Sequence, residues 1–182
     1  DGVIDTNDRT MIGRGLPIHT GGFTNNFEYK GFDLSVFFQW SYGNDVLNAN
    51  RLFFDSGFQK KRELNQYASY TDRWTPENPN SNIPAATNSS SNLVISSRVV
   101  EDASFLRLKT VTLGYTVPKT FLKKYKIDNA RLYVAAQNLW TITGYSGYDP
   151  EVSIRSGGLT PGLDFSSYPR ALSVSFGINL GF

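Results

Sequence analysis

The sequence has no cysteine and a single histidine, His19, among its 182 residues. The absence of cysteine excludes a disulfide framework, a thiol nucleophile and a thiolate metal site. His19 stands in no Ser-His-Asp or metal-triad spacing, and acids such as Asp102 and Glu151 have no catalytic partner that the sequence can show. We therefore expect that the protein is not an enzyme.

Charge and long apolar runs are also scarce. The formal net charge is +2 and the Lys and Arg residues are spread along the chain, so a nucleic-acid partner is not expected. No apolar run approaches the roughly 18 residues of a spanning helix, but alternating barrel strands need no such run. Residues 1–4 lack the charged and apolar regions of a signal peptide, so either the protein stays inside the cell or its true N-terminus lies upstream.

Aromatic residues are plentiful, at 14% of the sequence, and occur beside many Gly, Asn, Ser and Thr residues. The clearest strand is 170–182, where apolar and small polar residues alternate without a break. Its apolar parity holds Leu172, Val174, Phe176, Ile178, Leu180 and Phe182. Such a strand can turn one face to lipid and the other to a wet lumen. The alternation alone is equally typical of an inward-facing strand of a soluble β-sandwich.

The same period of two predicts four further strands, at about 21–29, 31–42, 104–117 and 130–145. Lys30-Gly31 is the expected turn between the first two. Aromatic residues lie at both ends of this hairpin, Trp40 and Tyr42 at one end and Tyr29 and Phe32 at the other. Aromatics in these places are typical of the two girdles of a membrane barrel.

Two of the strands have irregular faces, and their lumen-facing parity stays open. Arg107 and Lys109 share the parity of the apolar residues in 104–117, so they lie at a rim where long cations can reach water, or a bulge switches the phase. In the strand at 130–145, Asn138 interrupts an otherwise apolar parity. Gln137-Asn138 is therefore a candidate bulge.

The connections alternate in length. The turn at Lys30-Gly31 and the basic segment 118–129 are short, whereas 43–104, which contains helix-compatible residues, and 146–169 are long. Short turns on one side and long loops on the other are typical of an outer-membrane barrel. Five strands cannot close, because the smallest such barrels have about eight and an open edge in hydrocarbon leaves unpaired backbone groups. A barrel would therefore need strands from outside residues 1–182.

The first eight residues match the second half of a calcium-binding loop. Its ligands would be Asp1, the carbonyl of Val3, Asp5 and Asp8, and the first two ligands of the pattern would lie upstream. An acidic turn in which Asp5 or Asn7 bonds its own backbone explains the same residues. Calcium is the only cofactor that the sequence suggests.

Several segments, in this order, resemble the SusC/RagA-like TonB-dependent outer-membrane transporters of Bacteroidetes. They are DGVIDTNDRTMIG (1–13), GGFTNNFEYKGFDLSVFFQWSYGND (21–45), DRWTPENPNSNIP (72–84), SFLRLKTVTLGYTVPK (104–119), LYVAAQNLWTITGYSGYDPEV (132–152) and the terminal FGINLGF. The resemblance covers essentially the whole chain. It implies an all-β fold: the C-terminal five or so strands of an antiparallel up-and-down transmembrane β-barrel of about 22 strands, with long extracellular loops that contain some helix.

The resemblance also implies location and partners. Residues 1–182 would be the C-terminal segment of the barrel domain, without the plug domain, in the outer membrane of a Gram-negative bacterium with the C-terminus in the periplasm. Segments 1–20, 43–104 and 146–169 would then be extracellular. A SusD-like surface lipoprotein would cover the barrel, and the TonB complex would act through the missing N-terminal region. Outer-membrane lipid would surround the barrel.

The last strand also resembles the signal that the barrel assembly machinery recognises, polar-x-Gly-x-x-apolar-x-aromatic. The matching residues are Ser175, Gly177, Leu180 and Phe182. The resemblance therefore adds this machinery to the expected partners.

The implied function is TonB-dependent import of glycans or oligopeptides. Substrate-binding candidates in the long loops are Trp74, Tyr145, Tyr148, Asp149, Phe165 and Tyr168. Packing of the loops against themselves is the alternative role for each. The alternative for the whole chain is a secreted soluble β-sandwich that binds calcium or carbohydrate.

Overall fold

The computed structural model of the chain describes residues 6–57, 65–88, 93–154 and 161–182. The chain forms two compact units. The sheet unit comprises Ile18–Tyr42, Ser104–Gly144 and Pro169–Phe182. The loop unit comprises Asp1–Pro17, Gly43–Ala103 and Tyr145–Tyr168. Within the described residues, no helix is both long and apolar enough to cross a membrane.

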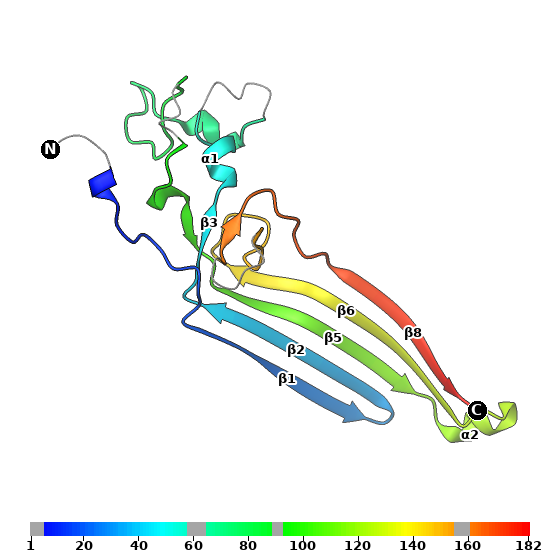
Figure 1. Cartoon of the computed structure of the whole chain (residues 1–182). Helices are drawn as coiled ribbons and strands as arrows, with labels where there is room; N and C mark the ends of the chain where they lie inside the picture. Colours follow the sequence, from blue (N-terminus) through cyan, green and yellow to red (C-terminus); the bar gives the residue numbers. More distant parts are fainter. Residues whose placement is uncertain (1–5, 58–64, 89–92, 155–160) are drawn as a thin grey trace. The chain divides into compact units, whose positions relative to one another are not determined.

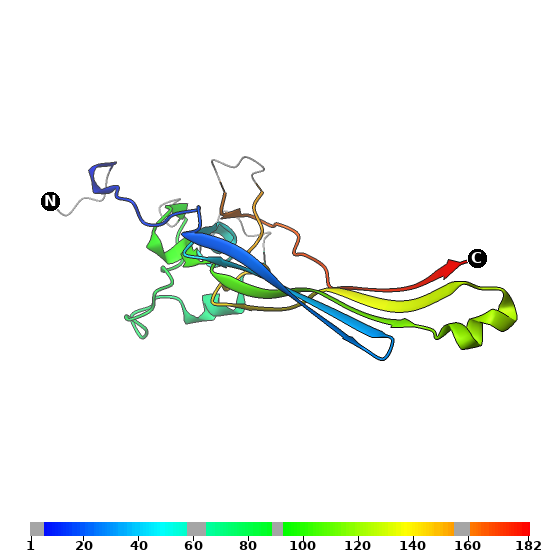
Figure 2. The same cartoon turned by 90° about the horizontal axis from the view of Figure 1, so that it is seen from below.

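The sheet unit contains the five predicted strands in one antiparallel sheet (Figure 1). These are β1 (His19–Tyr29), β2 (Phe32–Tyr42), β5 (Phe105–Thr116), β6 (Asn129–Thr143) and β8 (Ser173–Gly181). They are ordered β1-β2-β5-β6-β8, so each strand pairs with the next one along the chain that belongs to this sheet. Figure 2 shows them as a single twisted layer. The up-and-down β arrangement is confirmed, and the sheet is open, with β1 and β8 at its edges.

The turn between β1 and β2 lies at Lys30-Gly31, as predicted. Both residues have positive φ, 47° and 87°, which is the backbone that a two-residue type I′ hairpin requires. Tyr29 pairs with Phe32 directly before and after the turn. A Cβ on Gly31 would stand 2.9 Å from the carbonyl oxygen of Thr116. Glycine is therefore needed here for both conformation and space.

Strand register sorts the side chains into two faces. One row runs across all five strands as Phe27, Leu34, Leu113, Val134 and Phe176. The next row on the other face is Asn26, Ser35, Thr112, Ala135 and Ser175. We call these the apolar face and the polar face. Phe176 on the apolar face is 82% exposed, so no described residue covers its ring.

The predicted irregularities are bulges. In β5, Leu108 pairs with Phe38 while Thr110 pairs with Phe37, so Lys109 is an extra residue that switches the phase. Arg107 consequently lies opposite Gln39 on the polar face. Of the two explanations that the sequence left open for Arg107 and Lys109, the bulge that switches the phase is therefore the one found.

A second bulge lies in β6. Thr110 pairs with Gln137 and Leu108 with Trp140, which leaves Asn138 and the residue after it unpaired in this register. Asn138 has a positive φ of 53°, a conformation that asparagine tolerates better than most residues. The bulge predicted at Gln137-Asn138 is confirmed.

Aromatic side chains lie at both ends of the apolar face. At one end, the rings of His19 and Tyr42 stack with centroids 5.1 Å apart, and Trp40 Nε1 donates a hydrogen bond to His19 Nδ1 at 3.1 Å. At the other end, the rings of Phe32 and Tyr115 lie 4.6 Å apart. The predicted placement of aromatics at opposite ends of the first hairpin is therefore confirmed.

The basic segment 118–129 is more ordered than the simple turn expected. It forms α2 (Lys119–Leu122) and then a 3-10 turn, η6 (Lys123–Tyr125). Lys126 then takes a left-handed conformation with φ 55°, which ends the helical turns. The segment returns to the sheet where Asp128 N donates to the carbonyl of Gly181 at 2.8 Å.

The long segments expected as separate loops share a small sheet in the loop unit. Its strands are β3 (Asp45–Asn48), β4 (Val100–Asp102) and β7 (Leu163–Asp164), in the order β4-β3-β7. Short helical turns accompany it: η1 (Thr6–Asp8), α1 (Asn50–Phe54), η3 (Ala68–Asp72) and η5 (Ser97–Val99). Ala49, Leu52 and Val99 form one buried cluster, and Val46, Ala103 and Tyr145 form another. Leu163 from the second predicted loop packs against the first of these clusters, so residues from both predicted loops meet there.

We expect Gly31→Ala to lower the free energy of unfolding in urea by about 1–3 kcal/mol, because alanine is strained at this φ and its Cβ crowds a carbonyl. Gly144→Ala is the matched control, since a Cβ there has nothing within 4 Å. The control is expected to stay within about 0.5 kcal/mol of the unchanged protein. Equal losses in both variants would contradict the turn conformation.

Candidate functional site

Glu101 on β4 ties the segments of the loop unit together. Its carboxylate accepts hydrogen bonds from Ser146 N and Oγ, both at 2.9 Å, and from Asn48 Nδ2 at 3.1 Å. Arg51 on α1 forms an ion pair with it at 3.3 Å. Burial raises the pKa of Glu101, but these donors outweigh burial and hold its pKa below the usual range. The ionised carboxylate thus joins β3, α1 and the segment after β6.

A second carboxylate, Asp55, lies at the end of α1 and is 1% exposed. Arg51 and Arg98 form ion pairs with it at 3.3 and 3.6 Å, and Ser69 Oγ donates to it at 3.2 Å. Burial lowers the pKa of Arg98, and the Asp55 charge counteracts this effect. Because a buried charge is costly unless it is paired, these contacts fix the position of α1.

Two of the predicted substrate residues are buried and make structural contacts. Tyr145 is 6% exposed, and its hydroxyl donates to Asp164 Oδ2 at 2.7 Å. Burial, and then this hydrogen bond, raise the pKa of Tyr145, so it keeps its proton and remains a donor. Asp149 is 3% exposed, and its Oδ1 accepts from the backbone of Glu151 at 2.9 Å. In this conformation both residues shape the loop from inside.

The other four predicted residues present aromatic rings to solvent. Tyr148 and Tyr168 are 82% and 91% exposed, and Trp74 and Phe165 are about half as exposed, at 42% and 41%. The ring of Phe165 packs beside Phe53 with centroids 5.1 Å apart. These four side chains are exposed, whereas Tyr145 and Asp149 are buried, and substrate binding by any of the six remains a prediction.

Sequence reasoning missed Tyr67, which belongs with these aromatics. It is 38% exposed, and its ring lies 5.5 Å from that of Phe54. Burial raises the pKa of Tyr67, with smaller contributions from Tyr148 and Asp164. The signal in the sequence was weak, because Tyr67 stands shortly after a charged run that is typical of a solvated helix face.

The calcium prediction stays open. Asp1, Val3 and Asp5 lie outside the described residues, and Asp8 is exposed at the end of η1. Among the residues that the structure describes, no three His, Cys, Asp or Glu side chains gather as a metal site would require.

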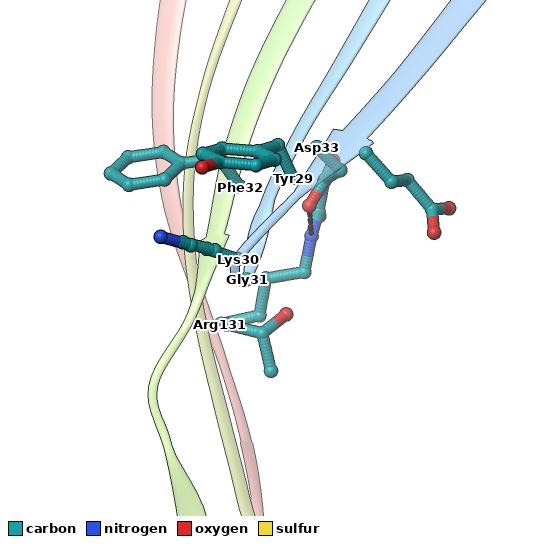
Figure 3. Close-up of a pocket in the computed structure, with 8 residues that line it drawn as sticks. Tyr29, Lys30, Gly31, Phe32, Asp33 and Arg131 are labelled. Atoms are coloured by element: carbon teal, nitrogen blue, oxygen red, sulfur yellow. Dashed lines mark hydrogen bonds and ion pairs between the residues drawn. The ribbon is translucent and has the colours of Figure 1, made fainter.

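A pocket of about 640 Å³ lies at the turn end of β1 and β2 (Figure 3). Arg131 donates through Nε to Asp33 Oδ1 at 3.0 Å and through Nη2 to Oδ2, which makes a two-pronged ion pair. The pair reaches from β6 to β2 across β5 at Gly114, where a Cβ would collide with both side chains. This cross-strand contact could not be read from the sequence.

The residues of the expected assembly signal lie on or just beyond β8. Ser175 and Gly177 are on the polar face, and the ring of Tyr133 occupies the space above Gly177. Leu180 is on the apolar face and pairs with Ala130. Phe182 follows the last strand residue and is 85% exposed. Recognition by the assembly machinery remains a prediction.

Comparison with known proteins gives relatives along the whole chain. TonB-dependent receptor P3 of Formosa agariphila is 38% identical over 187 residues, covering 100% of this chain and 18% of the receptor. TonB-dependent receptor SusC of Bacteroides thetaiotaomicron is 28% identical over 183 residues, covering 100% of this chain and 17% of SusC. No protein-family model matches the chain.

Solved structures agree with the sequence relatives. The RagAB peptide importer in its closed-closed state matches with a TM-score of 0.84 and 29% identity, covering 100% of this chain and 19% of the other chain. The chain covers 17% to 19% of the length of each of these relatives, which is less than a fifth.

These matches define the class: along its whole length the chain is related to part of the TonB-dependent receptors, and the relatives named here are receptors and a transporter. Within that class it is related to the SusC/RagA-like receptors, since SusC and RagAB both align with it over its whole length. The resemblance inferred from the sequence motifs is confirmed.

We expect Tyr145→Phe to lower the hydrogen-exchange protection of the β7 amides by about 1–3 kcal/mol, because the buried Asp164 carboxylate loses a donor. The matched control is Tyr148→Phe, whose hydroxyl lies on an 82% exposed side chain, and it should change protection little. A loss of the same size in the control would contradict the structural role of the Tyr145 hydroxyl.

Proposed function

We propose that the chain is the C-terminal part of the barrel of an outer-membrane importer that TonB energises. The observation that carries this proposal is the five-stranded sheet with one wholly apolar row beside one small and polar row. Its long strands have 9 to 15 residues, and roughly 9–11 tilted residues suffice to cross a bilayer.

Exposure supports the membrane over a soluble sandwich. Phe27, Leu132, Phe176 and Ile178 on the apolar face are 59%, 46%, 82% and 64% exposed. A sandwich would bury this face under a second sheet, and the described residues contain no other sheet in the sheet unit. Lipid is the occupant that fits such a surface.

The open edges support a larger barrel. The edge strands β1 and β8 each pair on one side only within the described chain. An unpaired edge in hydrocarbon costs several kcal/mol for each backbone group. The edges are therefore assigned to further strands of the same protein, in a barrel of about 22 strands.

The family suggests the orientation and the partners. The C-terminus faces the periplasm, and segments 1–20, 43–104 and 146–169 face outward, beside a SusD-like lipoprotein. TonB acts through a plug domain outside residues 1–182, and the barrel assembly machinery reads the last strand. The cargo is a glycan or an oligopeptide. The related RagAB is a peptide importer, and this supports a peptide as one of the two possible cargoes.

Ile178→Lys tests the membrane assignment. If Ile178 faces the middle of the bilayer, the charge should cost about 2–4 kcal/mol in the refolding of the full-length protein into lipid vesicles. Ser175→Lys is the control, because Ser175 lies on the polar face opposite Ala135. Asn179 makes a poorer control because it pairs with Arg131. Equal tolerance of both charges would contradict the assigned faces.

The exposed aromatics test the role of the loop unit. We expect the double variant Tyr148→Ala/Tyr168→Ala to weaken cargo binding to the full-length importer by about tenfold. Its unfolding temperature should stay the same, because exposed rings supply contact area without supporting the core. Glu77→Ala, an exposed loop substitution without an aromatic ring, is the control. Unchanged affinity in the double variant, measured by calorimetry, would refute these two residues as cargo contacts.

A further inference from the structure

The segment 118–128 between β5 and β6 carries an unusual concentration of positive charge. It contains Lys119, Lys123, Lys124 and Lys126 against a single acid, Asp128. All four lysines are exposed, and none of them forms an ion pair with another residue that the structure describes. Within the part of the chain that the structure describes, this charge is therefore uncompensated.

Two aromatic side chains stand among these lysines. Phe121 and Tyr125 are 69% and 67% exposed, although the neighbouring Leu122 is 7% exposed. The helical turns therefore bury one apolar residue to hold the segment in place and turn two rings outward. Rings beside cations at the end of membrane strands match the boundary between acyl chains and headgroups.

The burial pattern places the segment on the apolar side of the sheet. Ala130 pairs with Leu180 on the apolar face, yet it is 6% exposed, whereas Leu132 on the same face is 46% exposed. α2 lies shortly before β6 in the chain and contacts it. The helical turn therefore covers the end of the apolar face, and its cations lie where that face ends.

We propose that the segment 118–128 binds the anionic headgroups of phospholipids at the membrane surface. This inference rests on the proposed membrane-spanning role of the sheet. Lysines held near a membrane surface attract anionic lipid, and their effects accumulate when they cluster. Their long stems can follow the apolar surface while the ammonium groups reach phosphate oxygens. The exposed rings of Phe121 and Tyr125 fix the depth of the segment.

The test uses the full-length protein in nanodiscs of phosphatidylcholine with a minor share of phosphatidylglycerol. After mild re-extraction, native mass spectrometry counts the retained lipids. The unchanged protein should retain phosphatidylglycerol above its share of the bilayer, and salt should reduce this preference. Lys123→Gln with Lys124→Gln should lower the preference by roughly 25-fold, at about fivefold for each lysine.

Lys30→Gln is the matched control. Lys30 lies at the same end of the sheet, in the turn between β1 and β2, but its ammonium is held 5.1 Å from the centroid of the Tyr29 ring. This variant should retain the lipid preference of the unchanged protein. An unchanged preference in the Lys123/Lys124 variant, or no preference in the unchanged protein, would overturn the proposal.

Two further outcomes separate the proposal from its premise. If the full-length protein does not insert into nanodiscs, the membrane role and the headgroup site both fail. If it inserts without preferring phosphatidylglycerol, only the headgroup site fails. A Lys123/Lys124 variant that transports poorly but keeps its lipid preference would assign the segment to an acidic protein partner and overturn the lipid assignment.

Discussion

Backbone hydrogen bonding between neighbouring strands is the constraint on which the rest of the structure depends. It fixes the register, and the register decides which side chains share a face. The row from Phe27 to Phe176 is apolar throughout because five separate strands are paired in one phase. A slip of one residue in any strand would place polar groups in that row. The same bonding leaves β1 and β8 as the edges of the sheet within the described residues.

The two bulges show how the phase is kept despite a mismatched sequence. Lys109 is an extra residue in β5, which moves Arg107 to the polar face. Asn138 forms the corresponding bulge in β6. Asparagine suits this place because it accepts a positive φ at lower cost than a β-branched or bulky residue. The interruptions therefore preserve the separation of the faces.

Local patterns made much of the fold predictable. Alternating residues predicted the five strands, Lys30-Gly31 predicted the first turn, and Asn138 predicted the bulge. Each of these features could be predicted because its signal lies in neighbouring residues. The Asp33–Arg131 pair, 98 residues apart, and the small sheet of the loop unit depend on contacts that no local pattern encodes. For the candidate site, sequence supplied the aromatic loop residues, but their burial could not be foreseen. Only the structure separates Tyr145 and Asp149, inside the loop, from Tyr148 and Tyr168, outside it.

That separation shows how long loops can hold aromatic rings at their surface. Exposed aromatic rings on a loose loop would lose conformational entropy when a ligand binds, and this loss reduces affinity. In the loop unit, Glu101 and Asp55 accept hydrogen bonds and form ion pairs with residues of β3, α1 and the segments around them. The loops are therefore already ordered when the protein folds. Tyr145 holds Asp164 from within while Tyr148, three residues later, faces solvent. The buried polar contacts thus stabilise the loops, while the rings of Tyr148 and Tyr168 stay exposed to solvent.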